Sequence, residues 1–341
     1  MAYNSIEKFL ENPWEYNFEF ECGDEEYANL DALERYFVYK ITPGNTVYDG
    51  VNSFIDKHSQ LLNIYDADGS GKCFYPLIHS IYEKLWGWER NEVTFGTIGS
   101  WESEVLWGSD TMNSVQTVLN SLAKQLADDI NDLPTKKGHF SFNYIMECWL
   151  LNNEFKDRLN QQQKFKDYIN AYHTLGNFVI VPAGFNGFRG TNKSLCDYWD
   201  LSLDYLQKNE YGDFNPDSHF TKYINFFFLW DYVENKNDKY TVKEISPRDK
   251  NDITQFFTKS VKFINRRGKF MTAMLMLPEK DYKTLQSEIF AKNNVYNGFG
   301  EVISRIGNII TLKDEDPVKK ILNKLKNEEV PNAQKSSDDR N

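Results

Sequence analysis

Apolar side chains recur along most of this chain at intervals of three and four residues, which is the spacing of one helix face. A clear stripe contains Val47, Val51 and Phe54 and predicts a helix from about residue 46 to 65. We expect a mainly α, multi-helix globular fold. The same spacing predicts further helices at about 75–86, 109–131, 142–172, 194–208, 216–234, 249–266, 279–293, 297–307 and 315–327.

One segment, His173 to Ser194, departs from the helical pattern. Residues 178–181 form a short apolar run that is typical of a buried strand, and Pro182 closes it. Ser194 and Asp197 have the spacing of a capping box, which predicts that the next helix starts at Ser194. Because glycine permits positive φ and close backbone approach, we expect a glycine-rich loop between strand and helix. The glycines of this segment are Gly176, Gly184, Gly187 and Gly190.

The clearest internal break lies at 131–138, where proline, glycine and charged residues replace the helical stripe. We expect an N-terminal helical subdomain at 1–133 and a C-terminal helical subdomain at 139–327, which contains the short β element around 178–181. The stretch 328–341 has almost no apolar residues and is predicted to be a disordered acidic tail.

Composition narrows the classes of protein to consider. Aromatic residues make up 16% of the 341 residues, which is typical of a folded, aromatic-rich core. A net charge of −11 disfavours bulk nucleic-acid binding, although a local basic patch and a protein partner remain open. No apolar stretch approaches 18 residues, so no membrane span is predicted. The N-terminus lacks a signal-peptide pattern and the four cysteines form no Cys-x-x-Cys pair, so we expect buried free thiols and a cytoplasmic location.

The 173–194 segment has the order of elements that binds anions, because backbone amides and the positive end of a helix dipole point the same way. Arg189 and Lys193 would supply positive charge. From Gly187 to Ser194 the spacing approaches that of a phosphate-binding loop, but Asn192 stands where the second glycine belongs. The segment is therefore predicted to be a ligand- or partner-binding site, and the alternative is a glycine-shaped turn that only packs against helices.

Two resemblances bear on this segment. A longer pattern resembles a family of uncharacterised bacterial proteins, a domain of unknown function, and this resemblance implies no chemistry. The phrase Leu175 to Val181, followed by Asn186 and a helix, resembles the C-terminal part of His-Asn-His type nuclease domains. The residues that carry the longer pattern are His173, Gly176-Asn177-Phe178, Pro182, Arg189-Gly190 and Asp197-Tyr198-Trp199-Asp200-Leu201.

The nuclease resemblance implies a metal-dependent nuclease or phosphoesterase, with His173, Asn177, Asn186 and Arg189 as candidate catalytic residues. A divalent metal ion is expected only on this alternative, because it would activate water beside a phosphate. The upstream histidine of that domain is missing, since His139 lacks the neighbouring proline. The resemblance is therefore also compatible with an inactive, diverged domain.

Carboxylates suggest two further sites. If a helix began at Ser194, one face of it would contain Asp197, Asp200 and Asp204. That face would be either a solvated acidic surface or a cation site opposite Arg189 and His173. We count them with Arg189 and Lys193 as candidate binding residues. Residues 66–77 resemble half of a calcium loop, but Leu77 replaces the required glutamate, so no metal site is predicted there.

The densest basic cluster is predicted to lie at the end of one helix that stops at Gly268, where cations favour the negative helix end. A phosphate or nucleic-acid contact is the alternative. Three function classes thus remain: a ligand- or partner-binding protein, a diverged nuclease, and an interaction or scaffold protein of a phage-defence or regulatory system that docks through residues 1–27. The basic residues are Lys259, Lys262, Arg266, Arg267 and Lys269.

Overall fold

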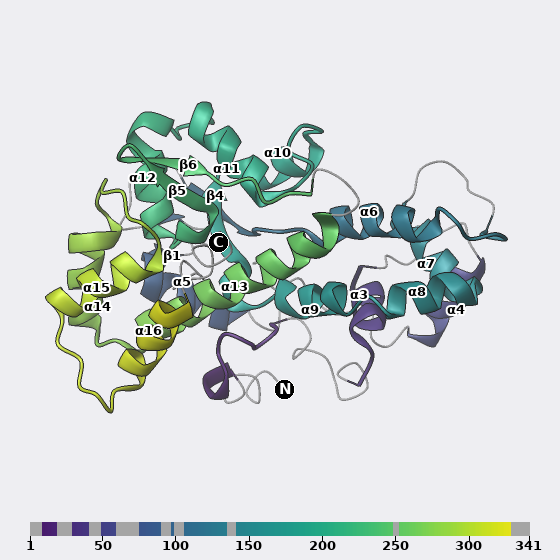
Figure 1. The fold of residues 1–341 in the computed structure, drawn as a ribbon, viewed down its shortest axis with the longest axis horizontal. Coiled ribbons are helices and arrows are strands. Elements are labelled where there is room, and N and C mark those ends of the chain that lie inside the picture. The colour runs from purple at the N-terminus through teal and green to yellow at the C-terminus, as the bar shows by residue number, and fades with distance from the viewer. Residues whose placement is uncertain are drawn as a thin grey trace, which may run out of the picture.

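The fold is mainly helical, as the apolar spacing predicts (Figure 1). The computed structural model describes residues 9–18, 29–40, 49–58, 75–89, 97–98, 106–134, 141–247 and 252–328. The predicted tail beyond residue 328, His139 and most of the calcium-like loop lie outside these ranges.

The helices follow the apolar stripes approximately in extent, but the described ranges contain more of them than predicted, because 142–172 divides into three helices and a further helix lies in the expected loop. Those before the central strand are α3 (Ala32–Lys40), α4 (Asp49–Lys57), α5 (Tyr75–Trp86), α6 (Val115–Ala127), α7 (Phe142–Leu151), α8 (Asn153–Asn160) and α9 (Gln163–Tyr172). Those after it are α10 (Phe185–Thr191), α11 (Trp199–Lys208), α12 (Pro216–Phe226), α13 (Ile253–Met276), α14 (Glu279–Leu285), α15 (Phe299–Ile309) and α16 (Pro317–Glu328). Short 3-10 turns, η3 (Leu175–Asn177) and η4 (Trp230–Tyr232), and a π turn, η6 (Gln286–Phe290), complete them.

Helix α13 runs through the middle of the molecule (Figure 1). It is 24 residues long and contacts α5, α9, η3 and α16, so elements from most of the chain meet on it. Helices α14–α16 lie at one end, α3, α4 and α6–α9 extend from the other, and α10–α12 lie along one side (Figure 1). This long helix therefore holds together segments that are far apart in sequence.

Three antiparallel strand pairs accompany the helices in the described residues: β1 (Trp88–Glu89) with β2 (Thr97–Ile98), β3 (Leu106–Thr111) with β4 (Phe178–Pro182), and β5 (Val233–Lys236) with β6 (Lys239–Val242). Strand β4 is fully buried, as its apolar run predicts. Its partner β3 comes from the other side of the predicted boundary at 131–138. Residues before and after that boundary therefore share one small sheet, and the division into two subdomains stays a prediction.

The structure corrects several predicted boundaries. Residues 109–111 belong to β3, and α6 begins only at Val115, after Ser114 in extended conformation. The expected glycine loop contains a helix, α10. The Ser194–Asp197 capping box does not form, because Cys196 and Asp197 have left-handed φ values of 48° and 59°, and α11 starts at Trp199.

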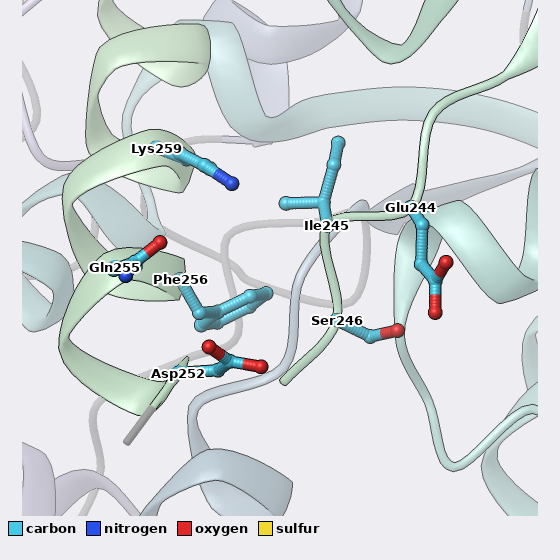
Figure 2. A pocket seen from close by; sticks show the side chains of 7 residues that line it. All are labelled: Glu244, Ile245, Ser246, Asp252, Gln255, Phe256 and Lys259. Atoms are coloured by element: carbon cyan, nitrogen blue, oxygen red, sulfur yellow. The ribbon is translucent and has the colours of Figure 1, made fainter. Parts of the chain in front are cut away.

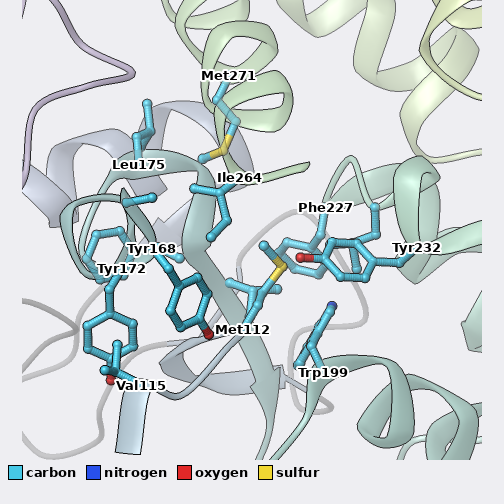
Figure 3. Packing of buried hydrophobic residues seen from close by; sticks show 14 of the residues in the cluster. Met112, Val115, Tyr168, Tyr172, Leu175, Trp199, Phe227, Tyr232, Ile264 and Met271 are labelled. Atoms are coloured by element: carbon cyan, nitrogen blue, oxygen red, sulfur yellow. The ribbon is translucent and has the colours of Figure 1, made fainter. Parts of the chain in front are cut away.

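Side chains from both halves of the chain pack into one apolar cluster (Figure 3). Met112 and Val115 come from the end of β3 and the start of α6, and they gather with Tyr168, Trp199 and Ile264 from later helices. Much of the aromatic content predicted for the core lies in this cluster. None of the helices in the described ranges has the length and apolar character that a membrane crossing requires.

The backbones of η3 and α13 approach each other closely at two glycines, Gly176 and Gly268. A Cβ atom on Gly176 would lie 1.8 Å from the carbonyl oxygen of Ile264 and 2.7 Å from the amide nitrogen of Gly268. Only glycine fits at residue 176 without moving one of the two backbones. Gly268 lies on the other backbone. The sequence predicts that the helix ends at Gly268, and this is wrong, because α13 continues through Gly268 to Met276.

The side chain of Arg267 stabilises the same junction. Its guanidinium is buried and donates hydrogen bonds to the carbonyl oxygens of Gly176 at 2.8 Å, Phe178 at 2.6 Å and Phe227 at 2.8 Å. Burial lowers the pKa of Arg267 to about 10, so the group remains protonated at neutral pH. Arg267 thereby ties α13 to the start of β4 and to the end of α12.

Candidate functional site

Arg189, a candidate for both catalysis and binding, is buried. It donates hydrogen bonds to the carbonyl oxygens of Thr111 at 2.8 Å and Met112 at 2.6 Å, and to that of Asp197 at 3.1 Å. Its Nε also lies 3.2 Å from the Asp197 carboxylate. The guanidinium therefore joins α10 to the end of β3 and to the left-handed turn before α11, which is a packing role.

His173 and Asn177 are buried in the same region. The His173 ring is nearly parallel to the Phe178 ring at a centroid distance of 6.1 Å and lies 4.1 Å from that of Tyr172. The Asn177 amide donates to the carbonyl oxygen of Tyr172 at 2.6 Å and accepts from the backbone amide of Asn113 at 3.3 Å. Packing of the His173 ring and hydrogen bonding of the Asn177 amide within the fold therefore account for the burial of both side chains.

Burial lowers the pKa of His173 to about 3, and this shift makes a pH-dependent contribution to stability. The unfolded chain binds a proton at His173 below about pH 6.5, whereas the folded chain does not, so the free energy of unfolding falls as pH decreases from about 6.5 toward 3. Between pH 6 and pH 4 the loss from this group should be about 2 kcal/mol.

We expect His173→Phe, which keeps an aromatic ring but cannot titrate, to lose about 2 kcal/mol less stability than the parent between pH 6 and pH 4. Urea unfolding at several pH values, followed by tryptophan fluorescence, measures both slopes. Since slopes are compared, a constant change in stability caused by the substitution cancels. Identical slopes would contradict the lowered pKa.

The remaining candidates of the 173–204 region do not meet at one point. Asn186 and Lys193 are exposed. Asp200 is buried, whereas Asp204 is half-buried and pairs with Lys208 at 2.7 Å. The expectation that Asp197, Asp200 and Asp204 share one helix face is wrong, because Asp197 precedes α11 in a left-handed turn. Within the described ranges, no three histidine, cysteine or acidic side chains are grouped so that they could hold a metal ion.

The predicted basic cluster on α13 is also dispersed. Arg266 is buried and pairs with the buried Asp231 at 2.7 Å, while Lys269 pairs with Glu328 of α16 at 2.9 Å. With Arg267 in the core, only Lys259 and Lys262 are exposed. Of the predicted buried thiols, Cys148 is buried but Cys196 is exposed.

A polar pocket lies beside the start of α11, between the chain that leaves β6 and the first turns of α13 (Figure 2). We call it the α13 pocket. Its volume is about 240 Å³. It is lined by Glu244, Ile245, Ser246, Asp252, Gln255, Phe256 and Lys259.

Residues of the segment that the sequence singled out form the support of this pocket. The buried carboxylate of Asp200 accepts hydrogen bonds from the backbone amides of Ile245 at 2.7 Å and Ser246 at 2.8 Å, which fixes one wall. The Tyr198 ring contacts the Phe256 ring edge-on at a centroid distance of 5.4 Å, which fixes the other. Asp200 thus has a positioning role at a pocket, although it does not line it.

Opposite charges lie on one wall. Phe256 and Lys259 project from α13, and Asp252 from its N-cap, toward the 244–246 chain, with the ring between the carboxylate and the ammonium (Figure 2). Neither Asp252 nor Lys259 forms an ion pair with another described residue. Sequence reasoning missed this pocket, because its walls are held by Asp200 and Tyr198, which lie more than 40 residues earlier in the chain, and no local pattern shows those contacts.

Comparison of the chain with protein-family models, with curated proteins and with solved structures finds no match. The geometry of the chain itself is therefore the basis for a functional assignment.

Proposed function

We propose that this chain is a binding protein and that the α13 pocket takes a small zwitterionic ligand. The observation that carries the proposal is the pairing of Asp252 and Lys259 on one face of α13, on either side of the Phe256 ring (Figure 2). Residues seven positions apart are almost two helical turns apart and share a face. A ligand ammonium would meet Asp252, and a ligand carboxylate would meet Lys259.

The separation of the charges limits the ligand. Seven residues of α-helix rise about 10 Å, and helical side chains lean toward the N-terminus, which brings the Lys259 ammonium closer to Asp252 than that. This distance suits charges that are several bonds apart, as in a dipeptide. The pocket volume of about 240 Å³ is below the roughly 300–1,000 Å³ of sites for drug-sized ligands, which also favours a small molecule.

Binding explains the described residues better than catalysis does. The nuclease candidates His173, Asn177 and Arg189 lie in contacts that hold the fold together. Among the described residues that line the α13 pocket there is neither histidine nor cysteine. The buried Asp200 and the Tyr198–Phe256 contact support a preformed pocket, which lowers the ordering cost of binding.

The experiment uses glycylglycine as the probe and the methyl signal of Ile245, a residue of the pocket wall, as the NMR readout. We expect a saturable shift with glycylglycine. N-acetyl-glycylglycine, which lacks the ammonium, and glycylglycine amide, which lacks the carboxylate, should each bind at least tenfold more weakly, because one charge pair is lost.

The same titration on variants assigns the two charges. Asp252→Asn and Lys259→Gln should each weaken glycylglycine binding at least tenfold, whereas Lys262→Gln should leave it unchanged. Lys262 is a matched control because it is exposed on the same helix and does not line the pocket. Equal binding of all three peptides, or equal effects of Lys259→Gln and Lys262→Gln, would rule the proposal out.

A further inference from the structure

A second pocket lies near the other end of α13, between α5 and α14, and is independent of the proposed function. Its volume is about 560 Å³, within the range typical of small-molecule sites. We propose that it binds an organic cation, specifically a primary alkylammonium group. Four observations carry this inference: a fixed floor, an unmatched carboxylate, a helix C-terminus and a π turn.

The floor of this α5–α14 pocket is fixed by hydrogen bonds between its two walls. The Tyr282 hydroxyl on α14 donates to the carbonyl oxygen of Leu85 on α5. The Lys84 ammonium donates to the carbonyl oxygen of Leu275, at the end of α13, at 2.5 Å. Because Tyr282 and Lys84 both line the pocket, the cavity is already formed without a ligand.

Four charged side chains line the pocket, and among the described residues one ion pair, between Lys283 and Glu279, joins two of them. Lys84 is engaged by the backbone carbonyl oxygen of Leu275, and Lys283 pairs with Glu279 at 2.6 Å. Glu83 is exposed on the wall and forms no ion pair with any residue in the described ranges. Its carboxylate is therefore the group available to a cationic ligand.

The end of α5 adds negative potential at the same place. The helix terminates at Trp86, and Gly87, with φ of 65°, donates its amide to the Glu83 carbonyl oxygen at 2.8 Å, which is a common way to close a helix. Gly87 itself lines the pocket. Because the C-terminal end of a helix carries a partial negative charge, this end favours a cation over an anion.

The opposite wall contains an irregularity that often marks functional sites. Helix α14 changes to π geometry at Gln286, and Gln286 lines the pocket. Single π turns inside α-helices are frequently found at functional sites. The amide oxygen of Gln286 would accept a hydrogen bond from an ammonium held by Glu83, and the Tyr282 ring would contact the alkyl chain.

The probe is 1,4-diaminobutane, and the readout is the side-chain amide signal of Gln286 in an NMR titration. We expect a saturable shift that 1,4-butanediol, which is uncharged and of similar length, does not produce. Glu83→Gln should weaken diamine binding at least tenfold. Glu288→Gln removes the same charge from an exposed position in η6 outside the pocket and should leave binding unchanged.

A second arm identifies the source of the ammonium group. Nα-acetyl-lysine-N-methylamide presents the group as a partner protein would, whereas the diamine presents it as a free polyamine. Binding of the lysine derivative at least as tight as that of the diamine points to a lysine side chain, and binding of the diamine alone points to a free polyamine. Equal losses in Glu83→Gln and Glu288→Gln, or an equal shift with butanediol, would overturn the inference.

Discussion

Gly176→Ala is expected to lower the free energy of unfolding by about 3 kcal/mol or more. The added Cβ would lie 1.8 Å from the Ile264 carbonyl oxygen and 2.7 Å from the Gly268 amide nitrogen. Both are backbone atoms of α13, so a rotamer change cannot relieve the overlap, and η3 and α13 have to separate. Urea unfolding followed by circular dichroism measures the loss.

Gly187→Ala is the matched control. Gly187 lies in α10, where an added Cβ would meet no atom within 4 Å. Alanine forms helix more readily than glycine does, so this variant should gain about 0.4–1 kcal/mol. A loss below about 1 kcal/mol for Gly176→Ala would show that the junction accommodates a methyl group and that the close approach is not required.

Arg267→Met should be nearly as destabilising, by about 3 kcal/mol. The substitution keeps most of the apolar stem but leaves the carbonyl oxygens of Gly176, Phe178 and Phe227 without their donor inside the protein. Each unsatisfied buried polar group costs about 1–3 kcal/mol, and the relief of a buried charge offsets part of that sum. The same urea experiment provides the measurement.

Arg305→Met is the comparison for Arg267→Met. Arg305 is exposed and pairs with Glu301 one helical turn away at 2.8 Å, so its loss should change stability by no more than about 0.5 kcal/mol. If the two methionine variants were equally stable, the three hydrogen bonds of Arg267 would not contribute to the fold.

Local patterns predicted much of this architecture from the sequence. The buried strand at 178–181 and the helices that begin near residues 216, 297 and 315 were recognisable from apolar spacing, and the helix near 216 also from its cap, because these signals are local. The failures lie where distant contacts decide the outcome. Helix α10 forms despite two glycines because Arg189 binds carbonyl oxygens at the end of β3, about 77 residues earlier.

The candidate site was harder to predict than the fold. Arg266 and Arg267 have the sequence signature of charges at a helix end, yet both are buried and α13 continues for nine more residues, to Met276. Asp200 was recognised as a candidate, but its role required knowledge that α11 packs beside the chain leaving β6. No periodic pattern contains that information, so the α13 pocket had no signal in the sequence.

The pairing of β3 with β4 has a practical consequence for anyone who divides this chain. A fragment that begins at residue 139 would keep β4 but lose β3, and it would expose the backbone groups of a strand whose five residues are all apolar or proline. An unpaired apolar edge is a template on which further copies of the chain add strands. The strand that joins the two halves in the whole protein would then drive aggregation of the C-terminal half expressed alone.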